Sequence, residues 1–344
     1  MIAAALQTGW LALLAAATLA FAVLVYVLLD GTDLGVGILF AMQRDSERRE
    51  LMVDTILPVW DGNETWIVLG GGGLIAMFPT AYGILLPALY PVFLMMLLAL
   101  IFRGVAIEFR EHGSERGKRR WDVTMFAGSL LAACAQGILL GALVQGIRVA
   151  NGAYAGGRWD WLTPFTCFCG AGLAIGYGWL GACWLIWRTS GELQAQARRA
   201  ALPLGVLTLL CTSGVAAWTP LLDASYASRW FVEYGVLPSV AAAALFALLA
   251  AAFVVAVRRE RHFAPLAAAL GWFVVAFGCV LFTIFPSMLP PSLSIAAAAS
   301  PPETEAFVLG GSAFLIPAIL AYSTFAFWVF RGKVPSNANT GSEE

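Results

Sequence analysis

The chain has 344 residues, of which 60% are hydrophobic and only 12% are charged, and its formal net charge is −1. Soluble domains carry about 25% charged residues. The composition therefore excludes a soluble globular protein and indicates an integral membrane protein. No basic patch with interleaved aromatic residues indicates a nucleic-acid partner.

Nine segments are apolar and long enough to cross a bilayer, which takes about 20 residues each. No Lys or Arg precedes the first segment; a cleaved signal peptide would need them, so this helix is expected to be retained. In chain order, the predicted helices cover residues 10–42, 51–77, 80–109, 122–147, 162–187, 200–221, 236–257, 264–288 and 307–330. Residues 1–333 are expected to form a single transmembrane domain, and residues 334–344 a disordered tail.

The basic residues predict how the chain is oriented. All but three of the 20 Lys and Arg residues lie near the end of, or after, the first, third, fifth, seventh or ninth predicted helix. The three exceptions are Arg148, Arg158 and Arg229. Because cytoplasmic loops carry an excess of Lys and Arg, we expect a periplasmic amino terminus and a cytoplasmic carboxyl terminus.

Ionisable residues within the apolar segments are concentrated in the first three predicted helices. The six that we single out are Asp30, Asp33, Asp61, Glu64, Arg103 and Glu108. Charge inside a membrane is costly and by default marks an ion or proton path. In the later helices, the main strongly polar residues are Gln136 and Gln145.

All six charges lie toward the predicted cytoplasmic end, and antiparallel neighbours with short connections would bring them together. Asp30 and Asp33 are three residues apart and share a helix face, as do Asp61 and Glu64. If all six converge, five carboxyl groups surround Arg103. Crowding of this kind favours groups that gain and lose a proton. We expect Arg103 to be the structural charge partner of Asp61 or Glu108.

A plainer interpretation stays open at this stage. Residues 9–29 alone could span the membrane core, which would leave Asp30, Asp33 and Arg103 at the cytoplasmic interface. Two features argue against it. An apolar stretch, LGVGILFAM, follows Asp33 before the next Arg. A helix over residues 10–42 would be about 50 Å long at 1.5 Å per residue, well beyond a core of about 30 Å.

The histidines limit the cofactors that the chain can hold. His112 and His262 are the only two, and both fall in predicted cytoplasmic loops. Membrane haems usually take axial His or Met ligands. We therefore expect this chain to bind no haem and no catalytic metal, so that any redox chemistry lies in a partner.

Three motifs in the first three helices resemble subunit II of cytochrome bd-type quinol oxidases. They are DGTDLGVG at residues 30–37, PVWDGNETW at residues 58–66 and IFRGVAIEFR at residues 101–110. The short chain and the WDGNETW spelling are most similar to the cyanide-insensitive branch. The resemblance implies an all-α polytopic fold with nine transmembrane helices, arranged as two four-helix bundles plus one extra peripheral helix.

The resemblance also implies an activity and a partner. Family members are haem-free and pair with subunit I, which carries haems b558, b595 and d together with the quinol site. The complex oxidises quinol and reduces oxygen to water in the bacterial inner membrane, generating a proton-motive force without pumping. This subunit would stabilise subunit I and conduct protons from the cytoplasm. A structural quinone in this chain and a small third subunit are left open.

Specific roles follow from the resemblance only where the motifs match. The carboxylate of the WDGN motif is Asp61 here, and the acidic residue after the Arg of the third motif is Glu108; both are implied in the proton route. Glu64 stands where other members have Gln, so we expect it to tune Asp61 at most. Trp60 is expected to pack toward the subunit interface. Asp30 and Asp33 match the DGTDLGVG motif and are candidates for the proton path, as is Glu64, but the resemblance assigns them no particular step.

A proton- or cation-coupled secondary transporter is the alternative function. It depends on the same intramembrane acids but needs no partner. Transporters of this kind usually have discontinuous helices near the membrane midplane and repeat symmetry. Here the acids lie off-centre and no repeat is visible in the sequence.

Overall fold

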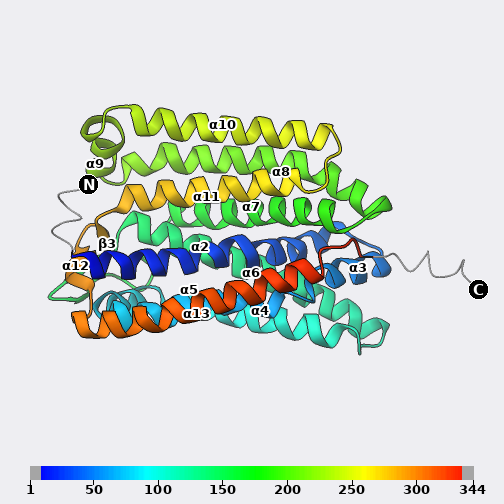
Figure 1. The fold of residues 1–344 in the computed structure, drawn as a ribbon, viewed down its shortest axis with the longest axis horizontal. Coiled ribbons are helices and arrows are strands. Elements are labelled where there is room, and N and C mark those ends of the chain that lie inside the picture. Colours follow the sequence, from blue (N-terminus) through cyan, green and yellow to red (C-terminus); the bar gives the residue numbers. More distant parts are fainter. Residues whose placement is uncertain (1–8, 335–344) are drawn as a thin grey trace, which may run out of the picture.

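Long helices account for most of the computed structural model, which describes residues 9–334 apart from the side chain of Glu115. They run side by side along one axis (Figure 1). The long helices are α2 (Trp10–Leu39), α4 (Trp60–Met77), α5 (Pro79–Arg110), α6 (Glu115–Gln145), α7 (Pro164–Arg188), α8 (Gly191–Trp218), α10 (Leu237–Arg258), α11 (Ala264–Ile284) and α13 (Pro302–Val329). The predicted tail, from residue 335 onward, lies outside the described residues.

Short elements connect these helices. They are η1 (Phe40–Met42), α3 (Ser46–Ile56), β1 (Val149–Ala150), β2 (Ala153–Tyr154), η2 (Thr219–Leu221), α9 (Ala224–Ser228), η3 (Arg229–Glu233), β3 (Ser287–Leu289), β4 (Leu293–Ser294) and α12 (Ile295–Ala298). The strands form two small antiparallel hairpins, β1–β2 and β3–β4. In Figure 1, α9, β3 and α12 gather at the end of the bundle where α2 begins, and α3 lies at the opposite end.

Eight helices of the described chain are long and apolar enough to cross a membrane. The first runs from Trp10 to Met42, with the bounds that the sequence predicts. The largest difference is at α8, which begins at Gly191 rather than at residue 200. Its first turns are polar and continue the helix beyond the apolar run.

The prediction of one continuous helix over residues 51–77 is wrong. α3 ends at Ile56 and α4 begins at Trp60. Pro58 lies between them and has no N–H to donate to the helix ladder, and the backbone leaves the helical region at the next residue, Val59, whose φ is −130°. α4 has 18 residues, or about 27 Å at 1.5 Å per residue, and is not among the eight apolar helices.

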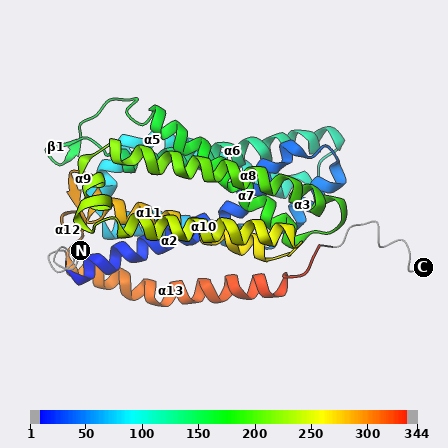
Figure 2. The same cartoon turned by 90° about the horizontal axis from the view of Figure 1, so that it is seen from above.

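The helix α2 lies at the centre of the packing. It contacts α4, α6 and α7, and the chain neighbours α5–α6, α6–α7, α7–α8 and α10–α11 also pack together. The last helix, α13, packs on α2 and α4 and lies along the edge of the molecule in Figure 2. This arrangement agrees with the predicted all-α membrane fold, whereas its division into two four-helix bundles stays a prediction.

Glycines let α2 and α7 approach each other closely. A Cβ atom built on Gly35 would lie 1.9 Å from the carbonyl oxygen of Tyr177, and one on Gly181 would lie 2.2 Å from the carbonyl carbon of Gly35. Only residues without side chains allow two helix backbones to meet at this distance. The contact fixes the DGTDLGVG segment against α7.

The glycine run at residues 70–73 of α4 packs on one side only. A Cβ on Gly70 would lie 3.6 Å from Val23 of α2, but one on Gly71 or Gly72 would meet nothing within 4 Å. One face of α4 therefore packs against α2, and the other makes no close contact with the described part of the chain.

Candidate functional site

Arg103 of α5 is the centre of a buried charge cluster. Its Nη1 donates to Asp30 Oδ1 of α2 at 2.7 Å, and its Nη2 donates to the Glu64 carboxylate of α4. Arg103 and Asp30 are both fully buried. One guanidinium thus ties together three helices. Its planar fork presents a separate nitrogen to each of the two carboxylates.

Asp33 belongs to the same cluster but has a different kind of partner. Its Oδ2 accepts a hydrogen bond from Asn63 Nδ2 of α4 at 2.7 Å. It is fully buried, and among the described residues no Lys or Arg nitrogen lies within 4 Å of its carboxyl group. Asp33 is therefore held by an amide rather than by a cation.

A chain of polar side chains continues from the cluster across the bundle. The Tyr177 hydroxyl donates to Gln136 Oε1, and Gln136 Nε2 donates to the Tyr26 hydroxyl, both at 2.8 Å. Tyr26 lies one turn before Asp30 on α2. Sequence reasoning singled out Gln136 but not the two tyrosines, because their periodicity is that of apolar packing.

The cluster contains only part of the predicted set. Asp30, Asp33 and Glu64 gather around Arg103, whereas Asp61 and Glu108 are exposed on the surface of the chain. The predicted pairing of Arg103 with Asp61 or Glu108 is therefore wrong.

Helix geometry explains both differences. Glu108 is five residues after Arg103, which puts it about 140° further round α5 at 3.6 residues per turn. On α4, Glu64 is about 60° from Asp61 by the same count. Its longer side chain reaches Arg103 from the edge of the buried face, whereas Asp61 remains outside.

The plainer interpretation, with the charges solvated at an interface, does not fit the buried residues. Asp30, Asp33 and Arg103 are each 0% exposed. Trp60 is half-buried within the chain: its ring lies against α5, where a Cβ on Gly104 would meet it at 3.2 Å.

A second ionic cluster, which sequence reasoning missed, lies between α3, α5 and α6. Asp122 accepts from Arg49 Nη1 at 2.8 Å and from Arg110 Nε at 2.7 Å. Arg110 and Asp122 are 3% and 4% exposed, although the sequence assigns the arginines to loops. Asp122 lies two residues after the basic run at residues 118–120, and this one acid at the start of an apolar segment is the signal that could have found it.

The described residues give few donors for a metal or haem. They contain no group of three or more His, Cys, Asp and Glu side chains placed to hold a metal ion. His112 lies in the connection between α5 and α6, and His262 lies between α10 and α11, where its Nδ1 is 3.1 Å from Gln194 Nε2.

These features define a class: a polytopic α-helical membrane protein with a buried arginine–carboxylate cluster near one end of its bundle. Within that class, the chain belongs to the family described as cytochrome bd terminal oxidase subunit II, whose model matches residues 11–330.

Individual relatives agree with this assignment. The chain is 27% identical to the Escherichia coli K12 cytochrome bd-I ubiquinol oxidase subunit 2, over 90% of this chain and 91% of that protein. It is 28% identical to the Bacillus subtilis cytochrome bd ubiquinol oxidase subunit 2, over 90% and 92%. The bd oxidase structure from Geobacillus thermodenitrificans has the same fold, with a TM-score of 0.78 and 15% identity, and the match covers 94% of this chain and 99% of that one. None of these matches supports a transporter.

Proposed function

We propose that this chain is the haem-free subunit of a bd-type quinol oxidase in the bacterial inner membrane, where it stabilises the haem-bearing subunit I and takes up protons from the cytoplasm. The family assignment supports membership of a multi-subunit oxidoreductase complex. Two relatives are named as ubiquinol oxidase subunits. The observation that carries the proton-uptake role is the buried carboxyl group of Asp33, which has no cationic partner.

The charge balance of the cluster favours proton exchange. Asp30, Asp33 and Glu64 carry three formal negative charges when ionised, and Arg103 carries one positive charge, which leaves −2. Buried charge without a counter-ion is costly, so a proton bound by one carboxylate relieves the cluster. Arg103 contacts Asp30 and Glu64 directly. We therefore assign to the Asp33 carboxyl group the binding and release of the transferred proton.

Small spaces and unpaired atoms support a hydrated route to Asp33. A cavity of about 10 Å³ lies between α4 and α13 beside Asn63, which is room for about one water. Asp30 Oδ2 and Arg103 Nε are buried without a hydrogen-bond partner in the described chain, and such atoms usually bind ordered water. Asp61, two residues before Asn63, is the surface group from which we propose that the proton starts.

The exposed acids also support a partner on the α4 and α5 side. Asp61 and Glu108 are exposed on this chain, and a carboxylate facing lipid is costly. On α4, Val68 is 70% exposed, and a Cβ atom built on Gly71 would meet nothing within 4 Å. A protein surface that covers this face within the membrane would shield it from lipid and could receive the proton that leaves Asp33, and we assign it to subunit I.

The number of crossings fits the family plan if α4 crosses the membrane. α2 begins and α13 ends at opposite ends of the bundle (Figure 1), which requires an odd number of traverses. With the eight apolar helices, α4 makes nine. Haems b558, b595 and d in the partner, a structural quinone, a small third subunit and the cyanide-insensitive branch all stay predictions.

The test of this function is the turnover of the purified two-subunit complex that carries Asp61→Asn. We expect quinol oxidation to fall about tenfold, which corresponds to about 1.4 kcal/mol of barrier, at unchanged haem content. Glu303→Gln, an exposed acid at the opposite end of the bundle, is the control and should turn over normally. Normal turnover in Asp61→Asn would refute the proposed starting point, and haem loss would point to a structural role.

A further inference from the structure

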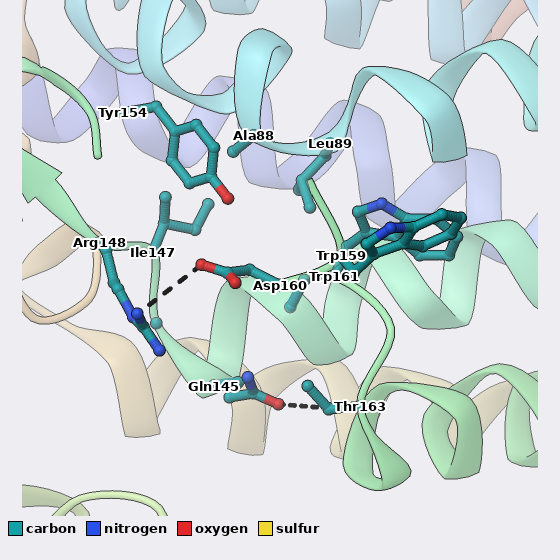
Figure 3. Close-up of a pocket in the computed structure, with 12 residues that line it drawn as sticks. Ala88, Leu89, Gln145, Ile147, Arg148, Tyr154, Trp159, Asp160, Trp161 and Thr163 are labelled. Atoms are coloured by element: carbon teal, nitrogen blue, oxygen red, sulfur yellow. Dashed lines mark hydrogen bonds and ion pairs between the residues drawn. The ribbon is translucent and has the colours of Figure 1, made fainter. Parts of the chain in front are cut away.

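Gln145, the second polar residue of the later helices, lies at a cavity away from the charge cluster. The cavity has a volume of about 190 Å³ and lies between α5, the end of α6 and the connection from residue 146 to residue 163 (Figure 3). Its floor is apolar and includes Ala88, Leu89 and Ala142. Its rim is polar and aromatic. An apolar floor under a polar rim suits a ligand that is itself amphipathic.

Two opposite charges face each other across the rim. Arg148 Nε lies 3.9 Å from Asp160 Oδ2, which is longer than a charge-assisted hydrogen bond of about 2.8 Å. The Arg148 side chain is 79% exposed and that of Asp160 is 35% exposed. Asp160 Oδ2 also accepts the Gly157 N–H at 3.0 Å, and the Tyr154 side chain lies next to the same carboxylate. Both charges therefore keep unused capacity for a ligand that carries a cation and an anion.

Gln145 adds a fixed donor. Its Oε1 accepts from Thr163 Oγ1 at 2.6 Å, which leaves the amide nitrogen facing the cavity in Figure 3. The Tyr154 hydroxyl donates to the carbonyl of Gly157 at 2.7 Å. Burial and the Asp160 carboxylate raise the pKa of Tyr154, so the phenol stays neutral. The cavity thus offers a cation and an amide donor on one side and a carboxylate on the other.

The position along the helices is that of a lipid headgroup. α5 has 32 residues, or about 48 Å, and exceeds a hydrocarbon core of about 30 Å by about 9 Å at each end if it is centred. Ala88 is nine residues from the start of α5, about 14 Å along the axis, so the floor lies just inside the hydrocarbon edge. The rings of Trp159 and Trp161, 5.7 Å apart, are typical of the interfacial region.

We propose that this cavity binds the headgroup of an aminophospholipid. The phosphate lies at Arg148 and the Gln145 amide, the primary ammonium donates to Asp160, and the first acyl carbons cover the apolar floor. An anionic headgroup would leave Asp160 unpaired and repel it. A quaternary ammonium has no N–H to donate to the carboxylate. The site should therefore prefer phosphatidylethanolamine over phosphatidylglycerol and phosphatidylcholine.

The test is a titration of the lipid-depleted two-subunit complex in detergent with dioleoylphosphatidylethanolamine, with bound lipid counted by native mass spectrometry. We expect Asp160→Asn and Arg148→Gln each to weaken the tightest lipid adduct at least fivefold. Arg158→Gln removes an exposed charge from the same connection, outside the cavity, and should leave the adduct unchanged. Asp160→Asn could disturb the fold of residues 146–163. The Arg148 side chain is largely exposed, so Arg148→Gln should leave that fold intact and still tests the site.

Three results would overturn the assignment. Equal binding of dioleoylphosphatidylglycerol would remove the role of Asp160. Equal binding of O-phosphoethanolamine, which has no acyl chains, would assign the site to a soluble phosphate compound rather than to a lipid. Unchanged phosphatidylethanolamine binding in both Asp160→Asn and Arg148→Gln would place the lipid elsewhere on the complex.

Discussion

Arg103 is the residue on which the first three long helices depend most directly. It is fully buried and contacts carboxylates from both α2 and α4. A buried ion pair adds little net stability over apolar packing, but removing one partner leaves the others as uncompensated charges. Arg103 therefore connects the three helices, and its loss should reduce assembly of the complex before it affects the turnover rate.

Arg103→Ala should reduce the amount of assembled complex sharply. The expected cost is about 3–5 kcal/mol, the range for breaking a buried pair, because Asp30 and Glu64 lose their counter-ion together. Two measurements check this: the haem absorbance of isolated membranes, normalised to cell number, and immunodetection of this subunit in the same membranes. Arg119→Ala, at an exposed basic position, is the matched control. A wild-type amount of assembled complex in Arg103→Ala would show that this connection between the helices is dispensable.

Asp54 of α3 gives a pH test outside the membrane-spanning helices. Burial, together with the Glu50 and Glu111 carboxylates, raises its pKa. A raised folded-state pKa means that its contribution to stability is complete below the ordinary value of about 4 and is lost as pH rises through the folded value. Asp54→Asn should therefore raise the thermal unfolding temperature of the complex at pH 7.5 by a few degrees at most, and by nothing near pH 4.

Asp223, the N-cap of α9, should behave in the opposite way. The hydrogen bonds from Ser225 lower its pKa, so its stabilising contribution is present above the ordinary value and is lost as pH falls. Asp223→Asn should lower the unfolding temperature at pH 7.5 and have no effect at low pH. Shifts of the same sign in the two variants would contradict this account of both carboxyl groups.

At the scale of elements, the contact between α2 and α7 sets where the charged segment lies. Gly35 and Gly181 bring the two backbones together, and the aspartates of the DGTDLGVG motif are then held toward α4 and α5. The break at Pro58 sets where α4 begins and so which of its polar residues point inward. These two backbone features, more than the charges themselves, decide the composition of the cluster.

Gly35→Ala should therefore damage the fold although it adds one methyl group. The new Cβ would meet the backbone oxygen of Tyr177, and overpacking of this kind costs about 1–3 kcal/mol. The readout is the unfolding temperature and yield of the purified complex. Gly278→Ala on α11, where a Cβ meets nothing within 4 Å, should be neutral or slightly stabilising, since Ala favours helix. Equal effects of the two substitutions would contradict the close contact.

The sequence predicts the apolar helices well because each carries its own signal. Hydropathy defines eight of them, and the first, from Trp10 to Met42, has the predicted bounds. The prediction from sequence fails where a single residue or a tertiary contact determines the structure. Pro58 divides the predicted helix at residues 51–77. The rotation of α4 about its axis turns Asn63 and Glu64 inward instead of Asp61. The Arg103 partners depend on that rotation, and the cluster around Asp122 depends on how α3 folds back.

At the scale of the whole molecule, the buried acids near one end and the exposed acids beside them form one asymmetric region. The opposite end carries the two hairpins and the aminophospholipid cavity, with few buried charges. A chain with this distribution fits a subunit that takes protons from one side and passes them sideways to a partner covering α4 and α5. The central claim is that these protons pass through Asp33.

Proton uptake during a single turnover tests that claim most directly. A pH-indicator dye would follow uptake as the fully reduced two-subunit complex reacts with oxygen, in the wild type and in Asp33→Asn, with haem spectra confirming intact cofactors. We predict that uptake in Asp33→Asn slows about tenfold or more, equivalent to about 1.4 kcal/mol, while the first oxygen-binding step keeps its rate. Uptake at the wild-type rate in a fully assembled Asp33→Asn complex would contradict the proposed route.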